Sequence, residues 1–296
     1  MSPTSPVKIL FVVNPGSGNN STDWTALITE NFQDRTAFHF EIMELNEDCD
    51  TESIRQRIKG FEPVRVVAVG GDGTVKMVAE CILNTEAVLG ILPAGSANGM
   101  AKELGIPEKS ADALTIIAEG QVKKIHTTQV NKHLCVHLSD IGFNAYLIKK
   151  FDTLQGRGMW GYLKASFKVM FNNPMMNVDI LVDHHFVKIR AAMIVIANAT
   201  KYGSGAVINP VGKLDDELFE VVALKKISLS EIFKMTFLNK AHNPMKTEIF
   251  QTSTLTIRSK RRVHFQVDGE YLGKVGEVKA EILPNSLSVL VPVAAE

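Results

Sequence analysis

The sequence predicts an α/β domain with a doubly wound sheet, followed by a domain built mainly of β-strands. Up to about residue 120, short apolar runs alternate with segments of helical spacing, and strand patterns dominate after Val122. The length of 296 residues exceeds the usual size of one domain, and 45% apolar residues can fill one or two cores. We therefore place the domains at residues 1–122 and 123–284.

The first domain begins with a strand that is expected to be buried on both faces. Residues 8–13 form a continuous apolar run, and the breaker sequence Asn14-Pro-Gly-Ser-Gly18 ends it. The spacing of apolar residues in the rest of this domain predicts strands at 38–45, 64–69 and 88–92, and helices at 52–59, 75–83 and 97–104. Because strands and helices alternate, these strands should lie in one parallel sheet.

The second half of the chain has a different pattern of apolar residues. Strands are predicted at 130–138, 176–183, 187–198, 219–224, 254–257, 263–267 and 277–283, and helical spacing at 159–171 and 230–238. No internal repeat or low-complexity linker separates the halves. The boundary between the domains is therefore placed only by the change in the spacing of apolar residues.

Composition excludes several function classes. Basic and acidic residues balance at 32 each, so no overall field attracts nucleic acid or an anionic bilayer. Cys49, Cys81 and Cys135 have no CxxC spacing, which favours a reducing compartment over a disulfide framework. The sequence shows no signal-peptide pattern and no apolar run of the ~20 residues that a membrane-spanning helix needs. We expect a cytoplasmic protein.

Three glycine-rich segments follow predicted strands of the first domain, at residues 14–20, 70–74 and 93–99. Ligands of open α/β sheets bind beyond the carboxyl ends of the strands. Glycine lets the backbone approach a phosphate, and the N–H groups of a helix start favour an anion. Residues 14–20 alone are equally typical of a turn, but together the three segments predict a cradle for a polyphosphate.

The segment Gly70-Gly-Asp-Gly-Thr74 is the most specific of the three. It places Asp72 where its carboxylate can face a nucleotide or its metal, and Thr74 where it can cap the next helix. The sequence contains no GxxxxGK[ST], HRD, DFG or HExxH pattern, and the first loop lacks the final glycine of GxGxxG. A P-loop ATPase, a protein kinase and a histidine-bound metalloenzyme are therefore disfavoured.

Six motifs in order resemble the diacylglycerol kinase catalytic domain family, which includes bacterial lipid kinases and sphingosine kinases. They are residues 14–18, 70–74, 89–98, Tyr202-Gly-Ser-Gly205, Leu214-Asp-Asp-Glu-Leu218 and Asp268-Gly-Glu270. The resemblance implies a nucleotide-binding first domain, a β-sandwich second domain, and a final segment, residues 285–296, that returns to the first domain. It also implies a lipid kinase that uses ATP and Mg²⁺.

The resemblance assigns site residues as well. It implies catalysis by Glu270 and a Mg²⁺ site at Asp216 completed by the backbone carbonyls of Lys213 and Leu218. The chemistry of phosphoryl transfer leads us to place Asp72 on the metal and phosphate side of the catalytic site. Nucleotide contacts are expected at Asn14, Gly70, Gly71, Asp72, Gly73, Thr74, Val75, Lys76 and Ser96. From the residues alone, Asp215 or Asp216 is equally a turn carboxylate, and Asp268 competes with Glu270 as the base.

Some positions depart from the family pattern, and they leave the acceptor open. Lys76 and Met77 stand where an Asn-Glu pair is usual, Gly99 replaces an aspartate, and no residue among 44–46 matches a threonine that contacts the nucleotide. We expect diacylglycerol or a related lipid as acceptor. The alternatives are a sphingoid-base kinase, an NAD kinase and a non-catalytic lipid- or nucleotide-binding regulator.

The expected partner is a membrane lipid, met by transient peripheral contact, with no nucleic acid and with homodimer formation left open. The helical apolar face of residues 159–171, beside Arg157, Lys164 and Lys168, is either a lipid-facing wall or core. The basic cluster Arg258, Lys260, Arg261 and Arg262 is expected on a solvated strand or turn.

Overall fold

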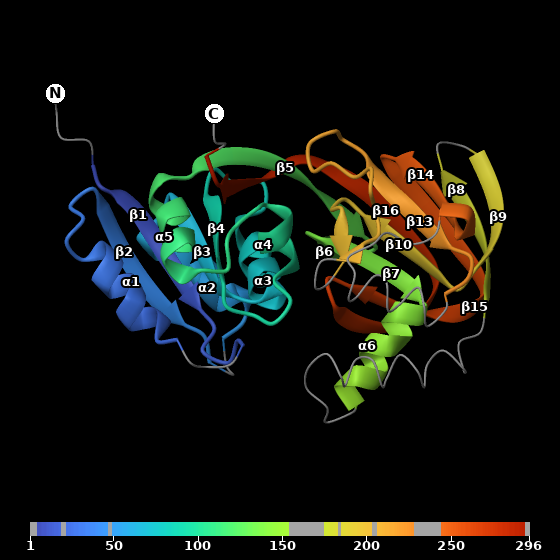
Figure 1. The fold of residues 1–296 in the computed structure, drawn as a ribbon, viewed down its shortest axis with the longest axis horizontal. Coiled ribbons are helices and arrows are strands. Elements are labelled where there is room, and N and C mark those ends of the chain that lie inside the picture. Colours follow the sequence, from blue (N-terminus) through green and yellow to red (C-terminus); the bar gives the residue numbers. More distant parts are fainter. Residues whose placement is uncertain are drawn as a thin grey trace. The chain divides into compact units, whose positions relative to one another are not determined.

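The computed structural model describes residues 5–18, 22–46, 49–153, 175–182, 185–202, 206–227 and 244–293. The chain divides into two compact units, Met1–Ile125 with Asn285–Glu296, and His126–Pro284. Two strands, β5 (Gln121–Val130) and β16 (Glu270–Val291), each contribute residues to both units (Figure 1).

The first unit contains a parallel sheet in the order β16-β4-β3-β1-β2. Its strands are β1 (Val7–Val13), β2 (Phe38–Glu44), β3 (Arg65–Gly70) and β4 (Val88–Pro93). Residues 9–13 and 66–70 are buried, as expected for central strands covered on both faces. The expected strands of this domain are all present.

Helices cover both faces of this sheet (Figure 1). They are α1 (Trp24–Phe32), α2 (Thr51–Phe61), α3 (Asp72–Ile82), α4 (Gly99–Glu103) and α5 (Ser110–Glu119). The right-handed rule for parallel connections places α1 on the face opposite α2 and α3, because the chain reverses direction across the sheet after β2. The ring of Phe32 in α1 lies 5.4 Å from that of Phe11 in β1.

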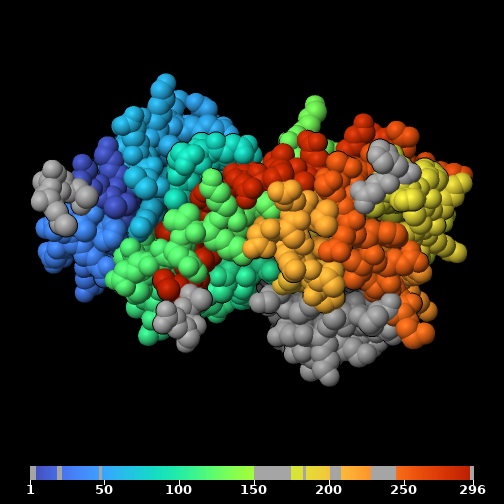
Figure 2. Space-filling view, turned by 90° about the horizontal axis from the view of Figure 1, so that it is seen from above, coloured from blue at the N-terminus to red at the C-terminus, as the bar shows by residue number. Residues whose placement is uncertain are grey.

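The end of the chain is part of this unit. Ser288 and Val289 of β16 pair in parallel with Val88 and Leu89 of β4. The side-chain amide of Gln121 donates to the carbonyl oxygen of Pro292 at 3.1 Å. In Figure 2 the last described residues (red) accordingly lie among green residues of the first unit.

The second unit is mostly antiparallel β-structure. Its described elements are β6 (His133–Cys135), β7 (Leu138–Gly142), α6 (Phe143–Thr153), β8 (Met176–Val182), β9 (His185–Ala191), β10 (Met193–Ala197), β11 (Lys201–Tyr202), β12 (Ala206–Val207), β13 (Phe219–Leu224), the 3₁₀ turn Pro244–Lys246, β14 (Thr247–Thr252) and β15 (Thr254–Val267). Along β10, Ile194 and Ile196 join one apolar core, and Met193 and Val195 join another that includes Leu147 of α6. Burial on both faces explains why β10 is a continuous apolar run.

Several predicted boundaries were wrong. Residues 130–138 contain the end of β5, β6 and the start of β7, joined through Asn131 at a φ of 54°. Residues 187–198 hold parts of two strands, β9 and β10, because the chain turns at Ala192 without a glycine or proline. The strands predicted at 254–257 and 263–267 are one strand, β15, whose register shifts between Arg258 and Val263.

The helices also differ from the prediction. Residues 97–104 contain only the short helix α4, because Asn98 has a left-handed φ of 51°. Helices α1, α5 and α6 were not predicted, and in α1 only Ile28 and Phe32 are buried, too few for a clear apolar stripe. The helical segments predicted at 159–171 and 230–238 lie outside the described residues.

Candidate functional site

The three glycine-rich segments of the first unit lie at one edge of its sheet. Each follows one of the neighbouring parallel strands β1, β3 and β4, so all of them extend beyond the same carboxyl ends. Backbone hydrogen bonds join them: the N–H of Asn14 donates to Val69 O, and that of Ala94 donates to Gly70 O, both at 2.9 Å. The predicted grouping of these loops is therefore present.

Asn14 links the first loop to the second. Its side-chain amide donates to the hydroxyl of Thr74 at 3.2 Å, and its Oδ1 accepts from the backbone N–H of Gly16 at 3.0 Å. Thr74 is buried inside the first turn of α3, whose N-cap is Gly71. The prediction that Thr74 caps this helix was wrong, because its hydroxyl lies against Asn14 instead.

Glycine is required where the loops touch. Gly18 has a φ of +67°, and a Cβ there would lie 2.2 Å from the carbonyl oxygen of Ala94. A Cβ on Gly95 would lie 2.4 Å from the Cα of Gly71. Real Cβ atoms do not approach backbone atoms so closely, so side chains at these positions would force the loops apart.

Asp72 joins the second loop to the helix that follows the third. Its two carboxylate oxygens accept from the backbone N–H groups of Gly99 at 3.0 Å and Met100 at 3.1 Å, at the start of α4. A carboxylate can accept about four hydrogen bonds, so these contacts leave capacity for a nucleotide or metal. Contact between Asp72 and a ligand remains a prediction.

A cavity of about 700 Å³ opens beside the first and third loops. Of the predicted nucleotide contacts, Asn14 and Ser96 line it, whereas residues 70–76 do not. In the second loop Gly73 is exposed and Gly71 and Asp72 are half-buried, whereas Thr74, Val75 and Lys76 are buried. Sequence reasoning missed Asp23, Trp24, Thr25 and Glu44, which complete one end of the lining. Only the register of β1 with β2 brings Glu44 to this edge.

In the second unit, Asp268 lies in a tight hairpin turn between β15 and β16, and Glu270 follows the turn. Asp268 and Gly269 both have positive φ, 48° and 86°, as a two-residue turn of this kind requires. The Asp268 carboxylate accepts from three consecutive backbone N–H groups, those of Val136, His137 and Leu138, at 2.9–3.0 Å. Glu270 is exposed.

A buried polar network supports the same turn. The Gln266 amide donates to the Asp140 carboxylate at 2.5 Å, and its oxygen accepts from the N–H of Gly269 at 2.7 Å. Asp140 also accepts from the Asn144 side chain at 2.7 Å and the Ala145 N–H at 2.9 Å. Asp140 and Gln266 have no exposed surface. Sequence reasoning missed this network, although polar residues inside apolar strands were a signal.

The predicted metal loop is a tight turn. Glu217 has a φ of 57°, and the Asp216 carboxylate accepts from the Leu218 N–H at 3.3 Å. Nearby, Glu220 is fully buried and accepts from the side chains of Asn209 at 2.5 Å and Gln251 at 3.0 Å. Burial raises the pKa of the Glu220 carboxyl, and the Asp216 carboxylate adds to the rise against the two hydrogen bonds.

The oxygens of this region suit a hard cation. The buried side-chain oxygens of Asn198 and Asn209 have no hydrogen-bond partner. Among the described residues no three His, Cys, Asp or Glu side chains are grouped to hold a metal. A cation here would therefore need amide and backbone oxygens beside Asp216, which Mg²⁺ and Ca²⁺ accept. The use of the Lys213 and Leu218 carbonyls in such a site stays a prediction.

Two family models match nearly the whole chain. Residues 8–130 match the diacylglycerol kinase catalytic domain, and residues 141–291 match the YegS C-terminal NAD kinase beta sandwich-like domain. The chain belongs to the diacylglycerol kinase catalytic domain family. The predicted fold class, an α/β domain followed by a β-sandwich-like domain, is confirmed.

Individual relatives resemble the chain along most of its length. An uncharacterized protein of Synechocystis is 28% identical across 96% of this chain and 70% of its own length. Lipid kinase YegS of Escherichia coli K12 is 26% identical across 83% of this chain and 84% of its own.

Solved structures share the fold. A diacylglycerol kinase from Bacillus anthracis superposes with a TM-score of 0.74 at 19% identity, covering 97% of this chain and 98% of that one. An NAD kinase from Archaeoglobus fulgidus in complex with ATP gives a TM-score of 0.55 at 15% identity, covering 95% and 93%.

Other predicted features of this family member have mixed outcomes. Residues 159–171 and 203–205 lie outside the described part of the structure. The basic cluster lies on β15, where Arg258 pairs with Glu277 at 2.6 Å and residues 260–262 are exposed, as expected for a solvated strand. Among the described helices, none is long and apolar enough to span a bilayer.

Proposed function

We propose that this protein is an ATP-dependent kinase that phosphorylates a hydroxyl group of diacylglycerol or a related membrane lipid. The cavity of the first unit carries the proposal, because glycine-rich backbone from two loops lines it at the edge where α/β sheets bind ligands. Membership of the family supports kinase chemistry, and the name of the Escherichia coli relative supports a lipid acceptor.

The chemical step needs one base. The lipid hydroxyl oxygen attacks the γ-phosphorus of ATP, ADP leaves, and the hydroxyl proton passes to a carboxylate. We assign this role to Glu270. Asp268 is the weaker candidate because its oxygens already accept three backbone N–H bonds, whereas Glu270 is exposed beside the same turn.

The first unit binds the donor. Backbone N–H groups of the glycine-rich loops would hold the phosphates, with Asn14 and Ser96 at the cavity wall. Asp72 keeps the start of α4 against the second loop and has acceptor capacity left for the nucleotide or its metal. Positioning and charge neutralisation are the main demands of phosphoryl transfer, and this arrangement serves both.

Asp216, with the carbonyl oxygens of Lys213 and Leu218, would hold Mg²⁺. A bound Mg²⁺ would supply positive charge that holds these oxygens together and braces the second unit. The cytoplasmic enzyme would meet its lipid by transient peripheral contact with the membrane, and no nucleic acid takes part. Dimer formation is not required by this mechanism.

The test is ATP consumption with diacylglycerol in mixed micelles, a sphingoid base or NAD as acceptor, each against a reaction without acceptor. We expect turnover with a lipid, and loss of that turnover in Glu270→Gln. NAD is included because the Archaeoglobus NAD kinase shares the fold. Turnover with NAD alone would make the protein an NAD kinase, and ATP binding without turnover would favour a non-catalytic regulator.

A further inference from the structure

Glu44 stands beside the start of the first glycine-rich loop. In the parallel pairing of β1 with β2 it is the register partner of Val13, and the next residue, Leu45, donates its N–H to Val13 O at 2.7 Å. Asn14 begins the loop. Because neighbouring strands lie about 4.8 Å apart, the Glu44 backbone is one strand spacing from the point where the loop leaves the sheet.

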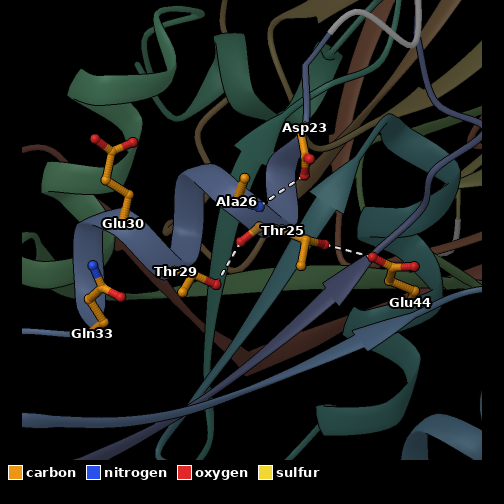
Figure 3. Close-up of a pocket in the computed structure, with 7 residues that line it drawn as sticks. All are labelled: Asp23, Thr25, Ala26, Thr29, Glu30, Gln33 and Glu44. Carbon is orange, nitrogen blue, oxygen red and sulfur yellow. Dashed lines mark hydrogen bonds between the residues drawn. The ribbon is translucent and has the colours of Figure 1, made fainter.

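Thr25 holds the Glu44 side chain. Its hydroxyl donates to Glu44 Oε1 at 2.6 Å, and Figure 3 shows this bond between α1 and the end of β2. Both residues line the cavity that the first and third loops form. An ionised carboxylate only accepts hydrogen bonds, so Glu44 offers this end of the cavity an oriented acceptor for hydroxyl or amino groups.

The charge at this end disfavours phosphate. A helix N-terminus in such a fold often binds phosphate, but the Asp23 carboxylate already caps α1 by accepting from the Ala26 N–H at 2.9 Å. Asp23 and Glu44 both line the cavity, and both would repel a phosphate. A nucleotide therefore lies best with its phosphates at the glycine-rich loops and its uncharged sugar toward Glu44.

We infer that Glu44 is a specificity-determining residue that accepts a hydrogen bond from the ribose 2′-hydroxyl of the bound nucleotide. This inference rests on the proposed use of ATP. In a nucleotide the ribose is bonded directly to the phosphates. Phosphates bound at the loop would therefore place the ribose near Glu44, which lies one strand spacing from the loop. In dinucleotide-binding α/β domains, an acidic residue placed after the second strand binds the same hydroxyl. The protein therefore prefers ATP to 2′-deoxyATP.

The experiment compares the Kd values of ATP and 2′-deoxyATP by calorimetry for the parent and for Glu44→Ala, Glu44→Gln and Thr25→Val. A hydrogen bond to a charged group is typically worth about 10-fold to 100-fold in affinity, so the parent should bind 2′-deoxyATP weaker by about that factor. Glu44→Ala should weaken ATP until the two Kd values agree, and leave 2′-deoxyATP unchanged. Thr25→Val should reduce the discrimination partly, because Glu44 loses its orienting bond.

Glu30→Ala is the matched control. Glu30 is an exposed carboxylate on the same helix. It lines the hollow drawn in Figure 3 but not the cavity beside the glycine-rich loops, so this variant should keep the parental Kd ratio. If the parent binds ATP but the ratio is near one, or if Glu44→Ala and Glu44→Gln both retain it, the inference is wrong and the proposed function stands. If the parent binds no ATP, the proposed function and the inference both fail.

Discussion

Replacing Asp268 by asparagine tests the roles of the two carboxylates in the turn between β15 and β16. In the parent, Asp268 Oδ1 accepts from the N–H groups of His137 and Leu138, and Oδ2 accepts from that of Val136. Asparagine tolerates the φ of 48° and keeps one oxygen, but its NH₂ group would face the third N–H. Asp268→Asn should therefore lower the stability of the second unit.

The magnitude follows from that one lost acceptor. An unmade bond to a sheltered N–H costs about 1–3 kcal/mol, and because Asp268 is half-buried we expect the lower part, about 1–2 kcal/mol. For 150–250 residues, 1 kcal/mol shifts the Tm by about 2–4 °C, so the drop should be about 2–8 °C. Glu270→Gln changes an exposed side chain and should alter stability by less than about 0.5 kcal/mol.

Turnover should respond in the opposite way. Glu270→Gln removes the proposed base and should lower kcat by about 10² to 10⁴-fold with little change in ATP affinity. Asp268→Asn should cost less, because the turn that carries Glu270 is also held by Gln266. The assay combines thermal unfolding, turnover at saturating lipid and direct ATP binding, with Glu281→Gln, an exposed carboxylate on the same strand, as control.

Two results would refute this reasoning. A parental Tm for Asp268→Asn would mean that the three backbone N–H bonds do not stabilise the turn. Near-parental turnover in Glu270→Gln would remove Glu270 as the base, and loss of ATP binding together with turnover would assign it to nucleotide or metal binding.

Three further predictions concern other carboxylates. Asp72→Asn should strongly lower Mg²⁺-dependent phosphorylation while circular dichroism shows an intact fold, with a Tm loss that reflects one weakened bond to α4; unchanged turnover would remove Asp72 from the site. Asp216→Ala should lower activity and abolish the rise in Tm that Mg²⁺ gives the parent, because an ion that binds only the folded state stabilises it; equal shifts in both proteins would contradict the assignment. Burial raises the pKa of Glu220 in the folded state, so that state binds its proton more tightly than the unfolded chain does. The free energy of unfolding should then fall as the pH rises from the ordinary glutamate pKa through the raised one, and Tm measured against pH should lack this component in Glu220→Gln; the same slope in both proteins would exclude Glu220 as its source.

Local patterns in the sequence were sufficient for much of the architecture. The buried strands of the first unit are continuous apolar runs because helices cover both faces, and each ends in breakers that the sequence shows directly. The glycine-rich loops could also be found from the sequence. The backbone at Gly18 and Gly95 requires glycine, and this local requirement is visible in the sequence. Periodicity failed where neighbouring strands share a turn without breakers, as at Ala192 between β9 and β10.

The roles of individual carboxylates could not be separated in this way. Asp268 and Glu270 are neighbours with the same chemistry, and what distinguishes them is a set of N–H groups from residues 136–138, far away in the chain. Asp72 likewise fits a ligand-facing carboxylate by sequence, and only the folded chain brings the start of α4 to it.

The sequence by itself determined the family, the order of the two domains and the loops at the edge of the first sheet, because these depend on short stretches of chain. Tertiary structure alone decided that Glu44 shares a cavity with the loop after β1, and that Gln266 and Asp140 support the turn before Glu270. Such contacts depend on strand register and on partners distant in sequence. Hydrogen bonds form only where donor and acceptor meet within about 3 Å, a condition that no local pattern records.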